Sequence, residues 1–266
     1  MTSPEVSVLM SVYNGAADLS RSLDSILNQT FSNFECVVVN DGSTDETAAI
    51  LDRYAESDGR IVVIHQENTG LTRALNVGLE HCQASLIARQ DADDVSHPDR
   101  LEQQVSFLSS NPGVVLLGTG VRLLDGEYRP YRTVSVPCTD AEIVRAMWKR
   151  NRFFHSSTMF RRDAVEKVGG YDPAFRQAQD YELWLALMEQ GEAANLDQPL
   201  VDLYQGPNRI SRKKARAQVS AALQAKKKHR RGRVLCKAPM HLFYWQLRGY
   251  ILPPGTWNSL VARFRR

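Results

Sequence analysis

Residues 34–47 read FECVVVNDGSTDET, a run of apolar residues that passes directly into a polar, glycine-containing segment. Apolar stretches of this length are typical of a strand that is buried on both faces of a parallel sheet. Ser43 and Glu46 have the spacing of a capping box, which predicts that a helix through Leu51 and Tyr54 begins here. The stretch therefore predicts a buried strand, a polar turn at its carboxyl end, and a helix.

The same alternation extends on both sides of this stretch. We predict strands at 6–13, 34–39, 60–65 and 86–88, and helices around 19–27, 43–54, 71–79 and 98–108. Strands that alternate with helices pair in parallel through right-handed crossovers, which gives a doubly wound α/β sheet. Ligands of such sheets bind beyond the carboxyl ends of the strands. Those ends are followed by Tyr13-Asn14, Asn40-Asp41 and residues 90–94, so we expect the functional site there.

The pattern changes after residue 113. We predict strands at 114–117, 121–124 and 157–160, and helices at 140–149, 163–168 and 179–190. The helix at 163–168 is expected to stop at Gly169-Gly170, because glycine readily adopts the left-handed conformation that ends helices.

Residues 91–94 read DADD and place three carboxylates within four residues, directly after a buried strand. Such groups repel one another unless a cation compensates them, and hard oxygen ligands suit Mg²⁺ or Mn²⁺. The flanking Arg89 and His97 could neutralise part of this charge. A structural alternative is that Asp94 and Ser96 only cap the helix that follows.

Six motifs occur in an order and spacing that resemble family 2 glycosyltransferases of the GT-A type, over roughly residues 5–205. They are SVLMSVYNG at 7–15, SILNQTF at 25–31, VVVNDGSTDET at 37–47, NTGLTRALNVGL at 68–79, DADDVSHPDRL at 91–101 and QDYELWL at 179–185. The resemblance implies a Rossmann-like, mixed but mostly parallel sheet, a nucleotide-diphosphate-sugar donor, Mn²⁺ or Mg²⁺, and inversion at the anomeric carbon.

The resemblance also implies roles for individual residues. It implies donor binding by Ser11, Tyr13, Asp41, Arg73, Asp91 and Asp93, metal binding by Asp93, Asp94 and His155, and a catalytic base at Asp180.

The chemistry of these side chains agrees with those roles. Tyr13 offers a flat face to a pyrimidine such as uridine, and Asp41 can accept hydrogen bonds from a base or ribose. The structural alternatives are a core aromatic for Tyr13 and a turn former before Gly42 for Asp41. Asp180 comes from a different element than the acidic cluster, as a base on the acceptor side requires, although it could simply be a helix N-cap. A lone histidine such as His155 is more often structural than a ligand.

One departure from the family concerns Pro207. Relatives often carry a Tyr-Arg-x-His segment whose histidine completes the metal or diphosphate site, whereas residues 204–207 here read YQGP. Substrate oxygens, water or His155 would then supply the missing ligand. The departure also raises the alternative of a sugar-nucleotide-binding or scaffold protein without turnover.

Charge is divided sharply along the chain. Residues 1–202 hold all 30 acidic and 17 basic residues, whereas residues 203–266 hold 16 basic residues and no acidic one. We therefore expect a catalytic domain at 1–206 and a basic, amphipathic helical extension at 207–266. Basic helices with aromatic residues suit an anionic membrane interface. The alternatives are a helical cover on the body, an oligomer contact or a nucleic-acid patch, of which nucleic acid is not expected because no binding module accompanies the charge.

Cysteine use and hydropathy predict the compartment. The four cysteines lie far apart and form no CxxC, and no apolar run is long enough to span a membrane. We expect a cytoplasmic protein that is peripheral on the inner face of the cell membrane. Its expected acceptor is a glycan or a lipid-linked saccharide in cell-surface polysaccharide synthesis.

Overall fold

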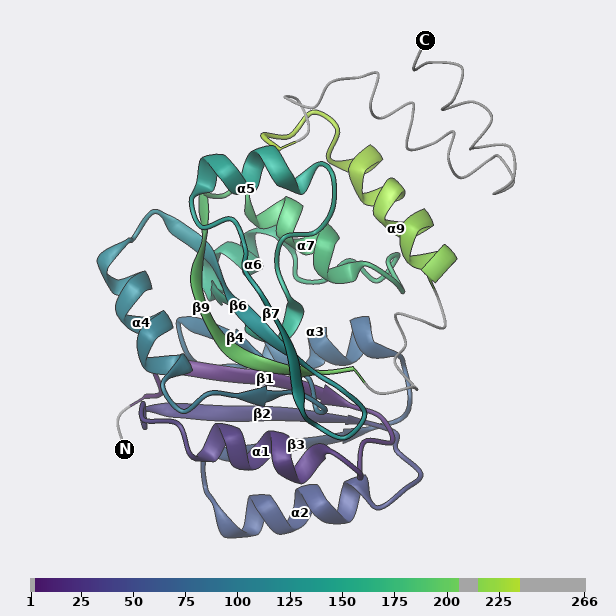
Figure 1. Cartoon of the computed structure of the whole chain (residues 1–266). Coiled ribbons are helices and arrows are strands. Elements are labelled where there is room, and N and C mark those ends of the chain that lie inside the picture. The colour runs from purple at the N-terminus through teal and green to yellow at the C-terminus, as the bar shows by residue number, and fades with distance from the viewer. Residues whose placement is uncertain (1–2, 206–214, 235–266) are drawn as a thin grey trace.

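Four parallel strands in the order β3-β2-β1-β4 form the first half of the sheet in the computed structural model, which describes residues 3–205 and 215–234 (Figure 1). The elements of this half are β1 (Val6–Val12), α1 (Leu19–Leu27), β2 (Phe34–Asp41), α2 (Thr47–Ser57), β3 (Ile61–Gln66), α3 (Leu71–His81) and β4 (Leu86–Arg89). The strands align so that β1, β2 and β4 all end at one edge of the sheet. The predicted alternation of strands and helices is confirmed.

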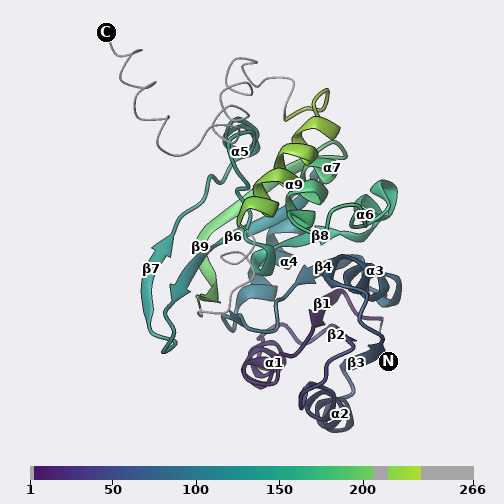
Figure 2. The ribbon, with the colours of Figure 1, turned by 90° about the vertical axis from the view of Figure 1, so that its right-hand side faces the viewer.

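Both faces of β1, β2 and β4 are buried because helices cover both, whereas the edge strand β3 is only partly buried. Leu9 and Val37 point into one core, against α3, whereas Val8, Met10 and Val38 point into a second core with α1 and α2. Successive side chains of a strand point to opposite faces, so burial on both faces requires the uninterrupted apolar runs seen in the sequence. Figure 2 shows α1 and α2 on one side of β1 to β3 and α3 on the other.

The second half of the chain extends the sheet with strands of both directions. Its elements are β5 (Val95–Ser96), α4 (Arg100–Ser110), β6 (Val114–Leu124), β7 (Pro130–Val134), α5 (Asp140–Met147), η1 (His155–Ser157), β8 (Met159–Arg161), α6 (Arg162–Val168), α7 (Gln179–Leu187), β9 (Glu192–Tyr204) and α9 (Ala215–Lys228). The sheet continues β4-β8-β6-β9-β5, with β7 on β6. β6 and β9 pair in parallel, while β8, β7 and β5 pair antiparallel with their neighbours. The predicted mixed α/β sheet is confirmed.

Two local predictions were wrong. The strands expected at 114–117 and 121–124 are the single strand β6, which runs through Gly118 and Gly120. A Cβ on Gly120 would lie 2.6 Å from the carbonyl oxygen of Asp197. This glycine therefore permits a close approach of the backbones of β6 and β9 and does not mark the end of a strand. The capping box is absent at Ser43, because α2 begins at Thr47, whose N–H donates to the Asp45 side chain.

The described part of the basic extension lies against the body. Ala222 and Ala225 of α9 pack into the core that contains α7. Lys228 Nζ and His229 Nε2 lie 2.6 and 2.8 Å from Oε1 of Glu182, a residue of α7 that is only 2% exposed. This is the packing predicted as one alternative for the extension. The remaining residues of the predicted extension, 207–214 and 235–266, lie outside the described residues.

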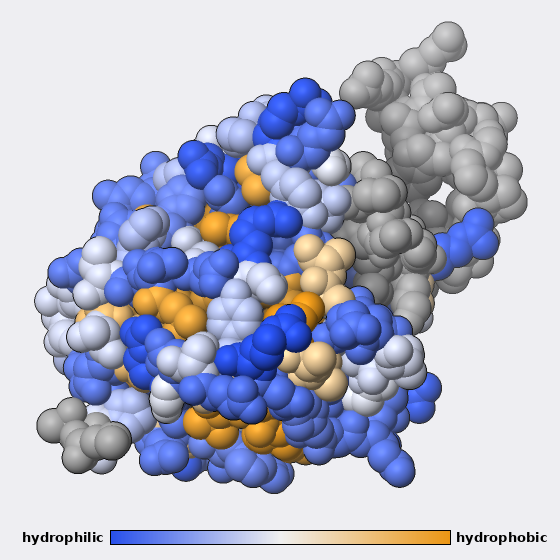
Figure 3. Space-filling view, turned by 90° about the horizontal axis from the view of Figure 1, so that it is seen from below, coloured by the Kyte–Doolittle hydropathy of each residue, from blue (hydrophilic) through white to orange (hydrophobic). Residues whose placement is uncertain are grey.

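The face of the molecule on the side of α1 and α2 is mostly polar. Figure 3, which views the molecule from the side of α1 and α2, shows small apolar areas separated by hydrophilic ones. Within 3–205 and 215–234, no helix combines the length and the apolar character that crossing a lipid bilayer requires.

We expect the contacts of α9 with Glu182 to stabilise the fold. The double change K228A/H229A leaves the buried Glu182 carboxylate without the Lys228 ammonium and without the hydrogen-bonding contact from His229, which should lower the free energy of unfolding by about 3 kcal/mol. Urea unfolding at pH 7.5 measures the change. K227A is the matched control, because Lys227 is exposed and should change stability by less than about 0.5 kcal/mol. Equal losses in the two proteins would contradict this role.

Candidate functional site

The acidic turn, formed by Asp91, Asp93 and Asp94, directly follows β4 at the carboxyl edge of the parallel strands. Arg89, the last residue of β4, is fully buried, and its guanidinium Nη2 donates to Oδ1 of Asp91. Its Nη1 donates to the carbonyl oxygen of Leu9 at 3.3 Å. A buried cation therefore compensates part of the charge of the acidic turn, as the flanking position of Arg89 suggested.

Ser156 joins two of the carboxylates. Its hydroxyl oxygen lies 2.7 Å from Oδ2 of Asp91 and 2.5 Å from Oδ2 of Asp94, and it accepts from the backbone N–H of Asp91 at 3.1 Å. The hydroxyl has one proton, so it can donate to only one of the two carboxylates at a time. The backbone N–H of Tyr204 donates to Oδ1 of Asp94 at 3.0 Å. Asp94 is thus a buried residue that ties the turn to β9, and it does not cap α4.

His97 lies away from the acidic turn. Its Nε2 is 2.9 Å from Oδ1 of Asp202, which also accepts from Arg122 at 2.7 Å. His97 therefore contacts Asp202 of β9 and does not neutralise the acidic turn.

Asp180 lies in the first turn of α7 and faces the charges of the acidic turn. Asn151 donates to its Oδ2 at 2.8 Å. Burial raises the pKa of Asp180 to about 6; the negative charge of Asp91 adds to the rise, while the Tyr181 N–H and Arg89 oppose it. A carboxyl group whose pKa lies just below neutral pH is ionised at neutral pH and can accept a proton, which are the properties of a general base.

The backbone before Asp180 is in an unusual conformation. Ala178, which precedes α7, has φ 53° and ψ 27°, the left-handed region that an alanine rarely adopts. Strained residues of this kind often occur at functional sites. Ala178 occupies the N-cap position of α7, and Asp180 is the second residue of the helix, so Asp180 does not stand at the N-cap as the structural alternative supposed.

His155 is held by aromatic side chains. Its Nε2 lies 2.9 Å from the hydroxyl of Tyr171, and its ring makes edge contacts with Tyr171 and Trp184. Burial, reinforced by the charge of Arg89, lowers the pKa of His155 to about 3, so the imidazole is neutral at physiological pH. The neutral form is the one that binds metals, but one ring nitrogen already has a partner here.

The acidic turn has the donor chemistry for a divalent cation. In the described part of the chain, no three His, Cys, Asp or Glu side chains are grouped to hold a metal ion by themselves. Magnesium sites typically use one or two carboxylates and take further oxygens from water and substrate phosphates. The partly exposed Asp91 and Asp93 fit such an open site, whereas Asp94 and His155 are engaged by Ser156 and Tyr171.

The predicted donor-binding residues lie along the carboxyl edge of the sheet. Ser11 is buried near the end of β1, and Tyr13 just beyond it is 53% exposed. Asp41 ends β2 and is buried: its Oδ1 accepts from the Thr69 N–H at 2.8 Å and its Oδ2 from the Gly70 N–H at 2.9 Å. Tyr13 is therefore no core aromatic, while Asp41 organises the loop that leads to α3.

Arg73 lies in the first turn of α3, directly after that loop. Its side chain is exposed and makes no ion pair within the described ranges. The structure thus groups Asp91, Asp94 and Asp180 through shared electrostatic and hydrogen-bonding partners. It places Tyr13, Asp41 and Arg73 on the neighbouring loops at the same edge.

An aromatic stack near the acidic turn was not anticipated. Tyr128, at the β6–β7 turn, stacks on Tyr204 with ring centroids 4.4 Å apart, and the guanidinium carbon of Arg21 lies 3.5 Å from the centroid of the Tyr128 ring. The Tyr128 hydroxyl also donates to Asp18. The stack joins the α1 region, the β6–β7 hairpin and the end of β9. No local signal in the sequence pairs these residues, because Tyr128 and Tyr204 are 76 positions apart and Arg21 and Tyr128 are 107 positions apart.

Comparison with known proteins places the chain in a described family. The family model described as Glycosyl transferase family 2 matches residues 7–169. The amylovoran biosynthesis glycosyltransferase AmsE of Erwinia amylovora is 34% identical over 222 residues, which is 82% of this chain and 83% of that protein. The O-antigen biosynthesis glycosyltransferase WbnJ of Escherichia coli is 36% identical over 186 residues, 70% of this chain and 72% of that protein.

Solved structures share the fold at lower sequence identity. Residues 1–349 of S. aureus TarS, in complex with UDP-GlcNAc, match with a TM-score of 0.72 and 15% identity over 93% of this chain and 71% of that chain. The mannosyltransferase PcManGT from Pyrobaculum calidifontis, in complex with GDP-Man and Mn²⁺, matches with a TM-score of 0.66 and 22% identity over 94% and 70%. These similarities confirm the GT-A type of fold.

We expect Ser156 to stabilise the acidic turn. In S156A the buried Asp94 loses its hydroxyl donor, which should lower the free energy of unfolding by about 1–3 kcal/mol. Urea unfolding in metal-free buffer measures this loss. S109A, on the exposed side of α4, is the matched control and should stay within about 0.5 kcal/mol of the wild type. A wild-type midpoint for S156A would show that the hydroxyl contributes nothing.

Proposed function

The chain belongs to glycosyl transferase family 2, and from this premise we propose that it moves a sugar from a nucleotide-diphosphate donor, a UDP-sugar in the first instance, to an acceptor hydroxyl with inversion. The observation that carries the proposal is that the Asp180 carboxylate on α7, which accepts from Asn151, lies close enough to the acidic turn after β4 for the charge of Asp91 to act on it. These two residues come from separate elements, so they can serve opposite sides of one reacting carbon. This is the division of labour that an inverting transfer requires.

Asp180 acts as the base in this proposal. Its carboxylate takes the proton of the acceptor hydroxyl while the acceptor oxygen forms a bond to the anomeric carbon, and the bond from that carbon to the diphosphate oxygen breaks. The nucleoside diphosphate leaves with the bonding electrons on the opposite face. Asn151, which donates to Oδ2 of Asp180, fixes the orientation of the carboxylate.

Donor binding is assigned to Ser11, Tyr13, Asp41, Arg73, Asp91 and Asp93. The exposed ring of Tyr13 can stack on the base, and the loop held by Asp41 presents Arg73 at its end. Mn²⁺ or Mg²⁺ would be held by the partly exposed Asp93 together with Asp91, and would offset the charge of the diphosphate. Asp94 and His155, the other expected ligands, are already engaged by Ser156 and Tyr171. The Mn²⁺ and nucleotide sugars named for PcManGT and TarS are consistent with this chemistry.

We assign the acceptor to a glycan or lipid-linked saccharide in cell-surface polysaccharide synthesis, and we place the enzyme on the cytoplasmic face of the membrane as a peripheral protein. The names of AmsE and WbnJ, which refer to amylovoran and O-antigen biosynthesis, support this acceptor class. A binding protein without turnover is the second candidate, because Pro207 stands where relatives often have a histidine.

Asp93 should be needed for metal-assisted donor binding. We expect D93A to lose the gain in UDP-sugar affinity that Mn²⁺ gives the wild type, because the cation loses a carboxylate ligand. Isothermal titration with a panel of nucleotide sugars, with and without Mn²⁺, measures this gain. D99N, a partly exposed carboxylate outside the acidic turn, is the control and should bind as the wild type does. If no nucleotide sugar binds the folded wild-type protein, the proposed function fails.

Asp180 should be needed for transfer and dispensable for donor binding. D180N should lower kcat by about 10²–10⁴-fold, the usual contribution of a general base, with an unchanged donor Kd. Because the active form is the ionised carboxylate and its pKa is raised to about 6, wild-type kcat/KM should fall as pH drops below 6. Nucleoside-diphosphate release measured from pH 5 to 8 tests both expectations. A D180N enzyme with normal turnover would remove Asp180 from this role.

A further inference from the structure

The basic residues of the described extension divide into two sets. The inward set has partners on the body: Lys228 contacts Glu182 and Asp172, and Arg233 contacts Asp140. Lys226 belongs to it as well, since it is buried and donates to the carbonyl oxygen of Lys149 at 3.4 Å; burial lowers the pKa of Lys226 to about 8. These cations hold α9 on the catalytic body, and body carboxylates already neutralise much of their charge.

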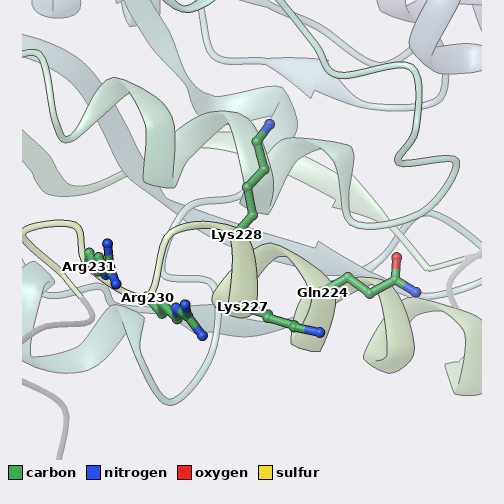
Figure 4. A pocket seen from close by; sticks show the side chains of 5 residues that line it. All are labelled: Gln224, Lys227, Lys228, Arg230 and Arg231. Atoms are coloured by element: carbon green, nitrogen blue, oxygen red, sulfur yellow. The ribbon is translucent and has the colours of Figure 1, made fainter.

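The outward set is Lys227, Arg230 and Arg231. All three are exposed, and with Gln224 and the stem of Lys228 they line an open hollow on the outer side of α9 (Figure 4). None of the three forms an ion pair within residues 3–205 and 215–234, and no carboxylate lines the hollow. The outward set is therefore a concentrated positive surface whose charge the described part of the protein does not neutralise.

We propose that the outward set is the surface through which the protein docks on anionic lipid headgroups. Mutual repulsion of three neighbouring cations is relieved when they approach a surface of opposite charge. The hollow is open and has no aromatic platform, so it fits headgroups lying in a plane better than stacked nucleic-acid bases. In the sequence, the chain beyond Val234 adds aromatic and aliphatic residues and arginines without any acidic residue, a composition suited to the interfacial zone of a membrane.

Screening explains why the outward set would matter more than the inward one. At physiological salt the Debye length is about 8 Å, so a membrane attracts mainly cations that reach the outer surface and are not already paired. The body has a formal charge of −13 and would be repelled by the same lipids. Docking through α9 would thus orient the protein with its acidic surface away from the membrane. This inference rests on the proposed peripheral location of the enzyme but not on the transfer reaction, because it concerns binding in the absence of donor and acceptor.

The full-length protein allows a direct test by co-sedimentation with vesicles. The probe is vesicles of 70% phosphatidylcholine and 30% phosphatidylglycerol at 0.15 M salt, compared with pure phosphatidylcholine. We expect binding to the anionic vesicles, and a loss on the order of 100-fold in apparent affinity for K227Q/R230Q/R231Q, since each cation near the surface contributes about fivefold. The control R53Q/R132Q/K167Q removes three exposed charges elsewhere and should lose less than threefold. Thermal unfolding verifies that both variants are folded.

Three results would overturn the proposal. They are absence of wild-type binding to the anionic vesicles, equal losses in the outward and control variants, and preferential binding of the wild type to duplex RNA over the vesicles in competition. None of these three results would change donor binding or nucleoside-diphosphate release. A failure of the docking proposal is therefore distinguishable from a failure of the proposed transfer reaction.

Discussion

A buried arginine beside a dense group of carboxylates is the electrostatic condition on which the site depends. Arg89 sits at the end of β4 with no exposed surface and binds Asp91, and its charge also acts on His155 and Asp180. Without a fixed cation, several carboxylates at the end of a buried strand would repel one another in a region of low dielectric constant. The turn can therefore remain folded before any ligand arrives. Arg100 donates a hydrogen bond to the Arg89 carbonyl oxygen at 2.8 Å and so helps to hold the end of β4 in place.

The first half of the fold was predictable because its signals are local. Parallel strands buried on both faces need unbroken apolar runs, and each run here is followed by a polar segment at the edge where the strands end. The second half was harder to predict, because a close approach between two strands that are distant in the sequence, β6 and β9, determines its structure. Gly118 and Gly120 read as a break, yet in β6 they are the residues that let β9 come close. Spacing along one strand carries no information about such a contact.

The same distinction separates the site residues that the sequence indicated from those it missed. The acidic turn and Asp180 stand in recognisable motifs, and the structure brings Asp91 and Asp180 within electrostatic range. Ser156, Asn151 and the Tyr128–Tyr204 stack belong to no motif, and each acts through a contact between residues 29 to 76 positions apart. Side chains that position others leave little trace in the sequence, because a serine or asparagine in a polar segment has many ordinary uses.

The charge of the extension shows why composition overstates what a surface can offer. The sequence assigns 16 cations to residues 203–266, but in α9 and the residues after it some of them are bound to body carboxylates such as Glu182, Asp172 and Asp140. Those pairs reduce the repulsion within the basic helix and the negative charge of the body at the same contact. A helix attached in this way can present only the cations of its opposite face. The formal charge of a segment therefore sets an upper limit, and the packing of the helix determines which part of that charge an approaching membrane meets.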